Sequence, residues 1–161
     1  MDWEKLFKMQ EQLDQYIEEK HDLSDRDLFQ EKYLALLVEL GELANETRCF
    51  KFWSTKPRSE KSVILEEYVD GIHFILSLGI KKGLRFNSSG ITTVNKSETE
   101  QFNDVFEACV TFKNIPSLQQ YQHLFTTFLQ LGDKLGFSEQ AIQEAYYKKN
   151  EVNYQRQNEG Y

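Results

Sequence analysis

The stretch YLALLVELGELANE, residues 33–46, decides the fold class. Its apolar residues cover nearly the whole circumference of a helical wheel, which is typical of a buried helix. At ~100° per residue, Glu42 and Glu46 fall within about 60° of Glu39, so the three carboxylates share one narrow stripe. Buried carboxylates need a cation, a proton or water to be tolerated. The stretch therefore predicts a buried helix whose acidic stripe lines an internal cleft.

A second stretch, SVILEEYVDGIHFILSLGIKK at residues 62–82, repeats this arrangement. Glu67 and Asp70 lie three residues apart on an otherwise apolar helix, and Phe74 projects between them on the helical wheel. Oxygen ligands without cysteine select hard cations, Mg²⁺ first, with Mn²⁺ or Ca²⁺ as substitutes. The two acidic pairs predict a metal site, and a solvated acidic stripe or ion pairs within a bundle are the alternative interpretation.

The rest of the chain follows the same helical pattern. With only 2 prolines and 8 glycines among 161 residues, apolar residues recur at helical spacing, which predicts an all-α fold. Because we find no linker and no internal repeat, we expect residues 1–161 to form one domain, a single bundle of about six helices. We expect a first helix from Asp2 to about Lys20 and a second from a cap at Ser24 or Asp25 through Glu46. Four further helices are expected: 62–82, 98–113 with a cap at Ser97, 117–135, and 141–157 with a cap at Ser138. The longest loop is expected at 83–97.

Composition excludes several functional classes. The net charge of −7 gives no general attraction to nucleic acid or to an anionic membrane, so phosphate binding must be local or mediated by a metal. The acidic N-terminus and the lack of a long apolar run predict neither a signal peptide nor a membrane span, and we expect a cytoplasmic protein. The two cysteines, Cys49 and Cys109, are expected to be reduced structural thiols.

Two basic segments are candidates for phosphate binding. The loop TRCFKFWSTK, residues 47–56, interleaves Arg48, Lys51 and Lys56 with three aromatic residues. Near the C-terminus, the residues Lys149, Asn153 and Arg156 fall at spacings of four and three, on one face of a helix. For this second group taken alone, a cationic helix end that complements the helix dipole is the favoured interpretation.

Four segments together resemble a known family: ELGELANE, FKFWS, EEYVDGIHF and KNEVNYQRQNEGY, in this order. They are similar to the dimeric, all-α dUTP pyrophosphatases, relatives of the MazG-type nucleotide pyrophosphatases. The resemblance covers most of the chain, up to Gly160 and Tyr161. It implies hydrolysis of dUTP to dUMP and pyrophosphate with Mg²⁺ or, as a substitute, Mn²⁺, in a homodimer.

The resemblance also implies roles for individual residues. The metal-binding motifs of the family fall on Glu39, Glu42, Glu67 and Asp70, and the C-terminal phosphate motif falls on Lys149, Asn153 and Arg156. Lys51, Trp53 and Lys56 match a loop that closes on substrate in such enzymes. His73 and Phe74 match a pair in which the aromatic ring stacks on uracil.

The first helix departs from the family. Where the family tends to offer a Gln and an Asn to the base, KMQEQLDQY offers Gln10 and Asp14, which share a helical face. A Gln amide can donate to a uracil carbonyl, and a carboxylate can accept the N3 hydrogen. An exposed polar face of an amphipathic helix is the alternative interpretation of these residues.

These residues suggest one mechanism and two alternatives to it. Mg²⁺ would bridge the four carboxylates and the triphosphate, Glu39 or Glu42 would accept the proton of the attacking water, and Lys149 and Arg156 would stabilise the leaving pyrophosphate. A nucleoside triphosphate pyrophosphatase of broader specificity is the nearest alternative. An interaction protein without enzymatic activity, in which acidic stripes only pair with basic ones, is the alternative from another class. A homodimer suits the apolar surplus of helices such as YQHLFTTFLQL.

Overall fold

The computed structural model describes residues 1–87 and 93–160, and within these ranges all regular structure is helical. Part of the expected loop at 83–97 and the final Tyr161 lie outside the described residues. The all-α prediction is confirmed. The helices are α1 (Trp3–Lys20), α2 (Phe29–Thr47), α3 (Lys61–Lys81), α4 (Glu98–Asn114), α5 (Leu118–Lys134) and α6 (Glu139–Asn158).

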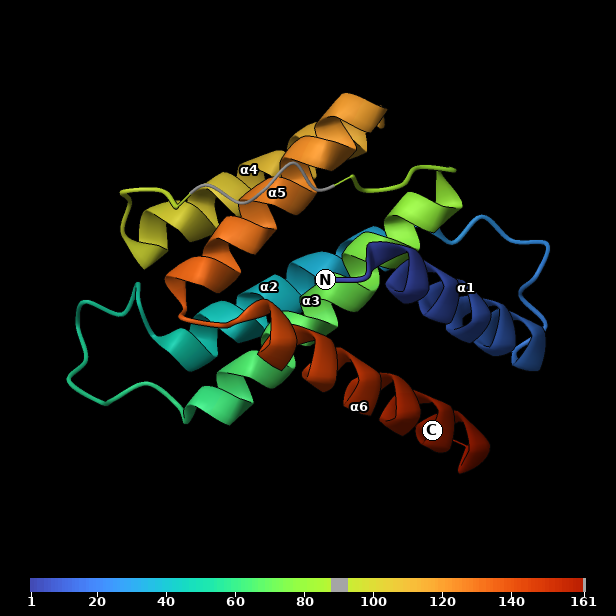
Figure 1. Ribbon diagram of the computed structural model, residues 1–161, viewed down its shortest axis with the longest axis horizontal. Coiled ribbons are helices and arrows are strands. Elements are labelled where there is room, and N and C mark those ends of the chain that lie inside the picture. The colour runs from blue at the N-terminus through green and yellow to red at the C-terminus, as the bar shows by residue number, and fades with distance from the viewer. Residues whose placement is uncertain (88–92, 161) are drawn as a thin grey trace.

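Helices α2 and α3 form an antiparallel pair through the middle of the molecule (Figure 1). Helices α4 and α5 pair on one side of it, and α1 and α6 lie on the other side (Figure 1). Both central helices are buried around much of their circumference because their sequences are apolar on most faces. As a result, polar groups of α2 and α3 that face each other are held in place by tightly packed neighbours.

The core gathers aromatic rings from α3 and α5. Tyr68 stacks on Phe128 with ring centroids 4.5 Å apart, and its hydroxyl donates to the Phe128 carbonyl at 3.1 Å. Tyr121 donates to the Ile75 carbonyl at 3.0 Å. The backbone at Gly79 lies directly against the Tyr121 ring, where a Cβ atom would overlap it. The glycine is therefore required for the close approach of α3 and α5.

The predicted helix caps Ser97 and Ser138 are confirmed. Each accepts a hydrogen bond from a backbone N–H three residues later, and Ser97 forms a capping box with Glu100. Ser117, predicted only as the start of the fifth helix, caps α5 in the same way. The prediction that Ser24 or Asp25 caps the second helix is wrong. That helix begins at Phe29, because Asp22 takes a positive φ of 55° and residues 23–26 form a turn closed by Arg26 N–H to Leu23 O.

No helix among the described residues is long and apolar enough to cross a membrane.

Candidate functional site

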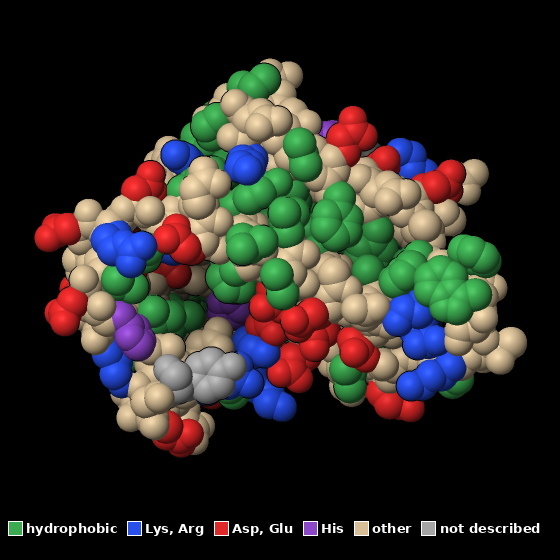
Figure 2. Space-filling view, turned by 180° about the vertical axis from the view of Figure 1, so that it is seen from behind, with side chains coloured by type: hydrophobic (Ala, Val, Ile, Leu, Met, Phe, Trp, Pro, Cys, Tyr) green, Lys and Arg blue, Asp and Glu red, His purple; other side chains and the backbone are tan. Residues whose placement is uncertain are grey.

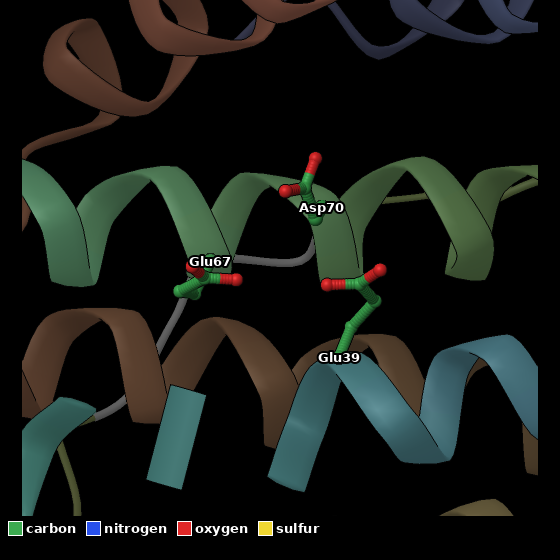
Figure 3. A group of neighbouring side chains, drawn as sticks. All are labelled: Glu39, Glu67 and Asp70. Atoms are coloured by element: carbon green, nitrogen blue, oxygen red, sulfur yellow. The ribbon is translucent and has the colours of Figure 1, made fainter. Parts of the chain in front are cut away.

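Three carboxylates from the central helices converge on one point. Glu39 extends from α2 toward Glu67 and Asp70 on α3 (Figure 3), and one oxygen of each lies within 4.8 Å of the others. All three side chains are partly buried. Three convergent oxygen ligands fit a hard divalent cation, because Mg²⁺, Mn²⁺ and Ca²⁺ prefer carboxylate oxygen to nitrogen or sulfur. We call these three residues the acidic cluster.

The electrostatics of the acidic cluster show a shortage of positive charge. Burial and the neighbouring charges of Asp70, Glu42 and Glu67 raise the pKa of Glu39 to about 7. Burial and the charge of Asp70 also raise the pKa of Glu67. A bound divalent cation would remove this penalty, because it offsets the repulsion between the carboxylates.

Glu42 lies outside the acidic cluster. Its side chain is exposed, whereas the three cluster carboxylates are partly buried. Its negative charge nevertheless contributes to the raised pKa values of Glu39 and Glu67. Glu42 is therefore beside the acidic cluster and in contact with solvent.

Lys149 on α6 is the cation nearest the acidic cluster among the described ion pairs. Its ammonium lies 2.7 Å from Asp70 Oδ2 and 3.0 Å from Glu66 Oε1. Burial raises the pKa of Asp70. The positive charge of Arg156 is close enough to lower that pKa in part. Asn153, between these two residues in sequence, is partly buried. The C-terminal face predicted for phosphate binding therefore adjoins the acidic cluster.

Gln10 on α1 is the centre of a buried hydrogen-bond network. Its Nε2 donates to Asp14 Oδ1 at 2.8 Å, and its Oε1 accepts from the Tyr146 hydroxyl at 2.9 Å and lies 2.7 Å from His73 Nδ1. Because a carbonyl oxygen only accepts, His73 donates from Nδ1 and leaves Nε2 as an acceptor. Burial lowers the pKa of His73 to about 3, which makes the imidazole neutral. The Gln10 amide is thus engaged mainly by other protein groups.

Two atoms beside this network lack a protein partner. His73 Nε2 and Asn150 Nδ2 are buried and form no hydrogen bond with any described residue. Asn150 lies one helical turn after Tyr146, whose ring stacks on His73 with centroids 4.1 Å apart. The buried region around His73 therefore contains polar atoms without a hydrogen-bond partner among the described residues.

Asp14 and Phe74 meet in a pocket of about 450 Å³ that extends along α2 and α3. Ala35, one turn before Glu39, and Phe74, one turn after Asp70, both line it. One helical turn rises about 5 Å, so the pocket begins close to the acidic cluster. The structure brings the predicted base-binding residues Asp14 and Phe74 together at this place.

The basic aromatic loop lies after α2 and projects into solvent. Trp53 is 64% exposed and packs edge-on against Phe50 and Phe52. Arg48 braces the loop by donating to Ser54 Oγ and to the Lys56 carbonyl. In the described ranges, neither Lys51 nor Lys56 forms an ion pair with the acidic cluster. The side chain predicted to cover the substrate, Trp53, is thus open to solvent in this structure.

Several residues at the site were not predicted. Glu66, Lys32, Ser77 and Tyr146 all contact predicted site residues. Helical spacing offered one signal, since Lys32 lies seven residues before Glu39 and Ser77 seven residues after Asp70. No sequence pattern pairs these residues with Asp14, which comes from a different helix.

Fold and site together define a class of protein: an all-helical chain with a candidate divalent-cation site built from carboxylates on two adjacent helices. Comparison with known families is more specific. The sequence model of the dUTPase family matches residues 2–161, and the chain belongs to this family of dUTP-hydrolysing enzymes. No curated protein matched the chain. The predicted family and the predicted enzymatic class are confirmed.

Proposed function

We propose that the protein hydrolyses dUTP to dUMP and pyrophosphate in a reaction that depends on Mg²⁺. The observation that carries this proposal is the acidic cluster, in which Glu39, Glu67 and Asp70 converge within 4.8 Å, in a chain of the dUTPase family. The reaction would remove dUTP from the nucleotide pool and supply dUMP. Mn²⁺ is the expected substitute for Mg²⁺, because it shares the preference for oxygen ligands.

The acidic cluster would hold the metal. When bound, the cation supplies positive charge that lets an acidic protein bind a triphosphate and that stabilises the charge developing on it. Lys149 and Arg156, with Asn153, would bind phosphate oxygens from α6, and Lys51 and Lys56 would approach from the loop at 48–60. The adjacency of Lys149 to Asp70 supports this role for the groups on α6.

We assign the general base to Glu42. The three cluster carboxylates would be engaged by the cation, whereas Glu42 is exposed and lies beside them. Its carboxylate would accept the proton of the water that attacks the triphosphate. Glu39 remains a ligand in this assignment.

The base and sugar would occupy the pocket lined by Phe74 and Asp14. Phe74 offers a ring for stacking on uracil, and Asp14 offers a carboxylate to the N3 hydrogen. Gln10 would position Asp14 through their hydrogen bond, and His73 would contribute its neutral imidazole as the partner of Gln10. Trp53 would cover the site when the loop closes.

The decisive assay is a substrate panel. Release of pyrophosphate from dUTP, dCTP, dTTP and the four ribonucleotides would be measured with Mg²⁺ and with a chelator. We expect turnover of dUTP in preference to the others, and none with the chelator. Similar turnover of the whole panel would favour a broader nucleoside triphosphate pyrophosphatase, and no turnover of any nucleotide would refute the proposal.

We further propose that residues 1–161 act as one domain in a cytoplasmic homodimer. The observation behind the dimer is an apolar surface on two adjacent helices, formed by Leu34 and Val38 on α2 and Val110 on α4. Leu34 is 62% exposed, and Figure 2 shows hydrophobic side chains running across the middle of the face seen from behind. Large exposed apolar surfaces usually mark an interface. The acidic composition offers no nucleic-acid or membrane partner.

A further inference from the structure

The Asp14 carboxylate joins three helices at the edge of the base pocket. It accepts from Gln10 Nε2 of its own helix at 2.8 Å, from Lys32 Nζ of α2 at 3.0 Å, and from Ser77 Oγ of α3. Lys32 also donates to Glu18 Oε1 at 2.8 Å. The side chains of Lys32 and Asp14 are each only 13% exposed, so water competes weakly for their contacts.

Hydrogen-bond capacity remains on both partners of this ion pair. A carboxylate offers about four lone-pair directions and an ammonium three N–H donors. In the described part of the chain, Asp14 uses three of its directions and Lys32 uses two of its donors. One acceptor direction of Asp14 and one donor of Lys32 are left, and both residues line the pocket of about 450 Å³ that contains Phe74.

We propose that Lys32 and Asp14 together recognise the imide edge of a pyrimidine base, so that Lys32 is a specificity residue for uracil over cytosine. The Asp14 carboxylate accepts the N3 hydrogen of uracil, and the Lys32 ammonium donates to the adjacent carbonyl oxygen. This inference rests on the proposed function, because it takes the base to lie in the pocket while the phosphates lie at the acidic cluster.

Cytosine fails this arrangement for a definite reason. At the same position it presents an unprotonated N3, whose lone pair would face the Asp14 carboxylate, and an amino group, whose hydrogens would face the Lys32 ammonium. Phosphates held at the acidic cluster limit how far the base can slide to avoid both clashes. A well-made pair of contacts to a base edge typically discriminates by about 10- to 100-fold.

Thymine supplies an internal control. Its imide edge is the same as that of uracil, and the two bases differ only in a methyl group that neither donates nor accepts a hydrogen bond. A change in Lys32 should therefore alter the ratio of dUTP to dCTP without altering the ratio of dUTP to dTTP. If the ion pair only holds three helices together, its loss would lower all activities alike.

The test compares four proteins: wild type, Lys32→Met, the double variant Lys32→Met with Asp14→Asn, and a control. The control is Lys81→Met, which replaces a lysine one helical turn after Ser77 on α3. For each, kcat/KM would be measured with dUTP, dCTP and dTTP, and binding of dUMP and dCMP would be measured by calorimetry without metal. In Lys32→Met we expect the preference for dUTP over dCTP to fall by about 10-fold or more. In the double variant, the amide introduced by Asp14→Asn can turn to present its donor and its acceptor to either base edge, so the preference for dUTP should not return.

The outcomes separate two failures. If wild type does not hydrolyse dUTP, the proposed function fails. If wild type prefers dUTP but Lys32→Met keeps the full preference over dCTP in turnover and in binding, the Lys32 inference alone is overturned. Equal losses for dUTP, dCTP and dTTP in Lys32→Met would also overturn it, because they indicate a structural role. Unchanged selectivity in Lys81→Met is the expected control result.

Discussion

Glu39 is the residue in which burial and function conflict most directly. It is partly buried and faces two other carboxylates, and these surroundings raise its pKa from 4.5 to about 7. A carboxyl group whose pKa is raised on folding binds more protons in the folded state. Between about pH 4.5 and pH 7 it therefore reduces stability as pH rises, and the full cost is present above pH 7.

This sign predicts a stabilising substitution in the metal-free protein. Glu39→Gln should raise the free energy of unfolding at pH 8 by about 1 kcal/mol, after allowance for solvent screening, and should change little at pH 4. Chemical denaturation at both pH values measures it, with the exposed Glu107→Gln as control. A loss of stability at pH 8 would contradict the prediction. Mg²⁺ should stabilise wild type more than the variant, because it binds the folded site.

The different surroundings of Glu39 and Glu42 predict different kinetic defects. Glu42→Gln should lower kcat by about 10²- to 10⁴-fold, as expected for loss of a general base, with metal affinity changed only a few-fold. Glu39→Gln should weaken the metal itself by about 10-fold or more. Mn²⁺ titration followed by electron spin resonance, together with pyrophosphate release, separates the two effects. Equal loss of metal affinity in both variants would show that Glu42 is a ligand.

At the scale of the elements, one close contact joins α3 and α5 near the C-terminal end of α3. Gly79 allows the Tyr121 ring to lie against the backbone of α3, the helix that also carries Asp70 and Phe74. Packing of this kind leaves no room for an added methyl group.

Gly79→Ala is therefore predicted to destabilise the protein by about 1–3 kcal/mol, although alanine favours helices. Thermal or chemical denaturation measures the change. In the double variant with Tyr121→Leu, which removes the obstructing ring, the cost should be less than the sum of the two single costs. Additive costs would mean that the contact with Tyr121 is not the cause.

Helical spacing predicted which carboxylates of α3 face α2, but it did not predict that Glu42 is exposed. The spacing of Glu67 and Asp70 placed both on the stripe that meets α2, and the structure brings them to Glu39. The same wheel placed Glu42 with Glu39, but the stripe is wider than the surface that α3 covers, and Glu42 is exposed. The spacing of residues along one helix does not show how much of its surface a neighbouring helix covers.

At the scale of the whole molecule, the apolar surface of α2 and α4 predicts self-association. We expect sedimentation at about 10 μM to give twice the mass of one chain, and Leu34→Lys to shift the protein toward monomer, because it would bury a charge in the interface. Leu118→Lys, at an exposed leucine on α5 outside this surface, is the matched control. A monomeric wild type, or dissociation by both substitutions, would argue against an interface at this surface.

The chain by itself determined the all-α class, the caps at Ser97 and Ser138, and the two acidic pairs, because these features depend on residues within one or two helical turns of each other. Only the tertiary structure decided that Lys149 adjoins Asp70, that Gln10 is held by His73 and Tyr146, and that Asp14 meets Lys32 and Ser77. Each of these contacts joins different helices. The packing of large apolar side chains across the whole core sets their approach, and no local spacing encodes it.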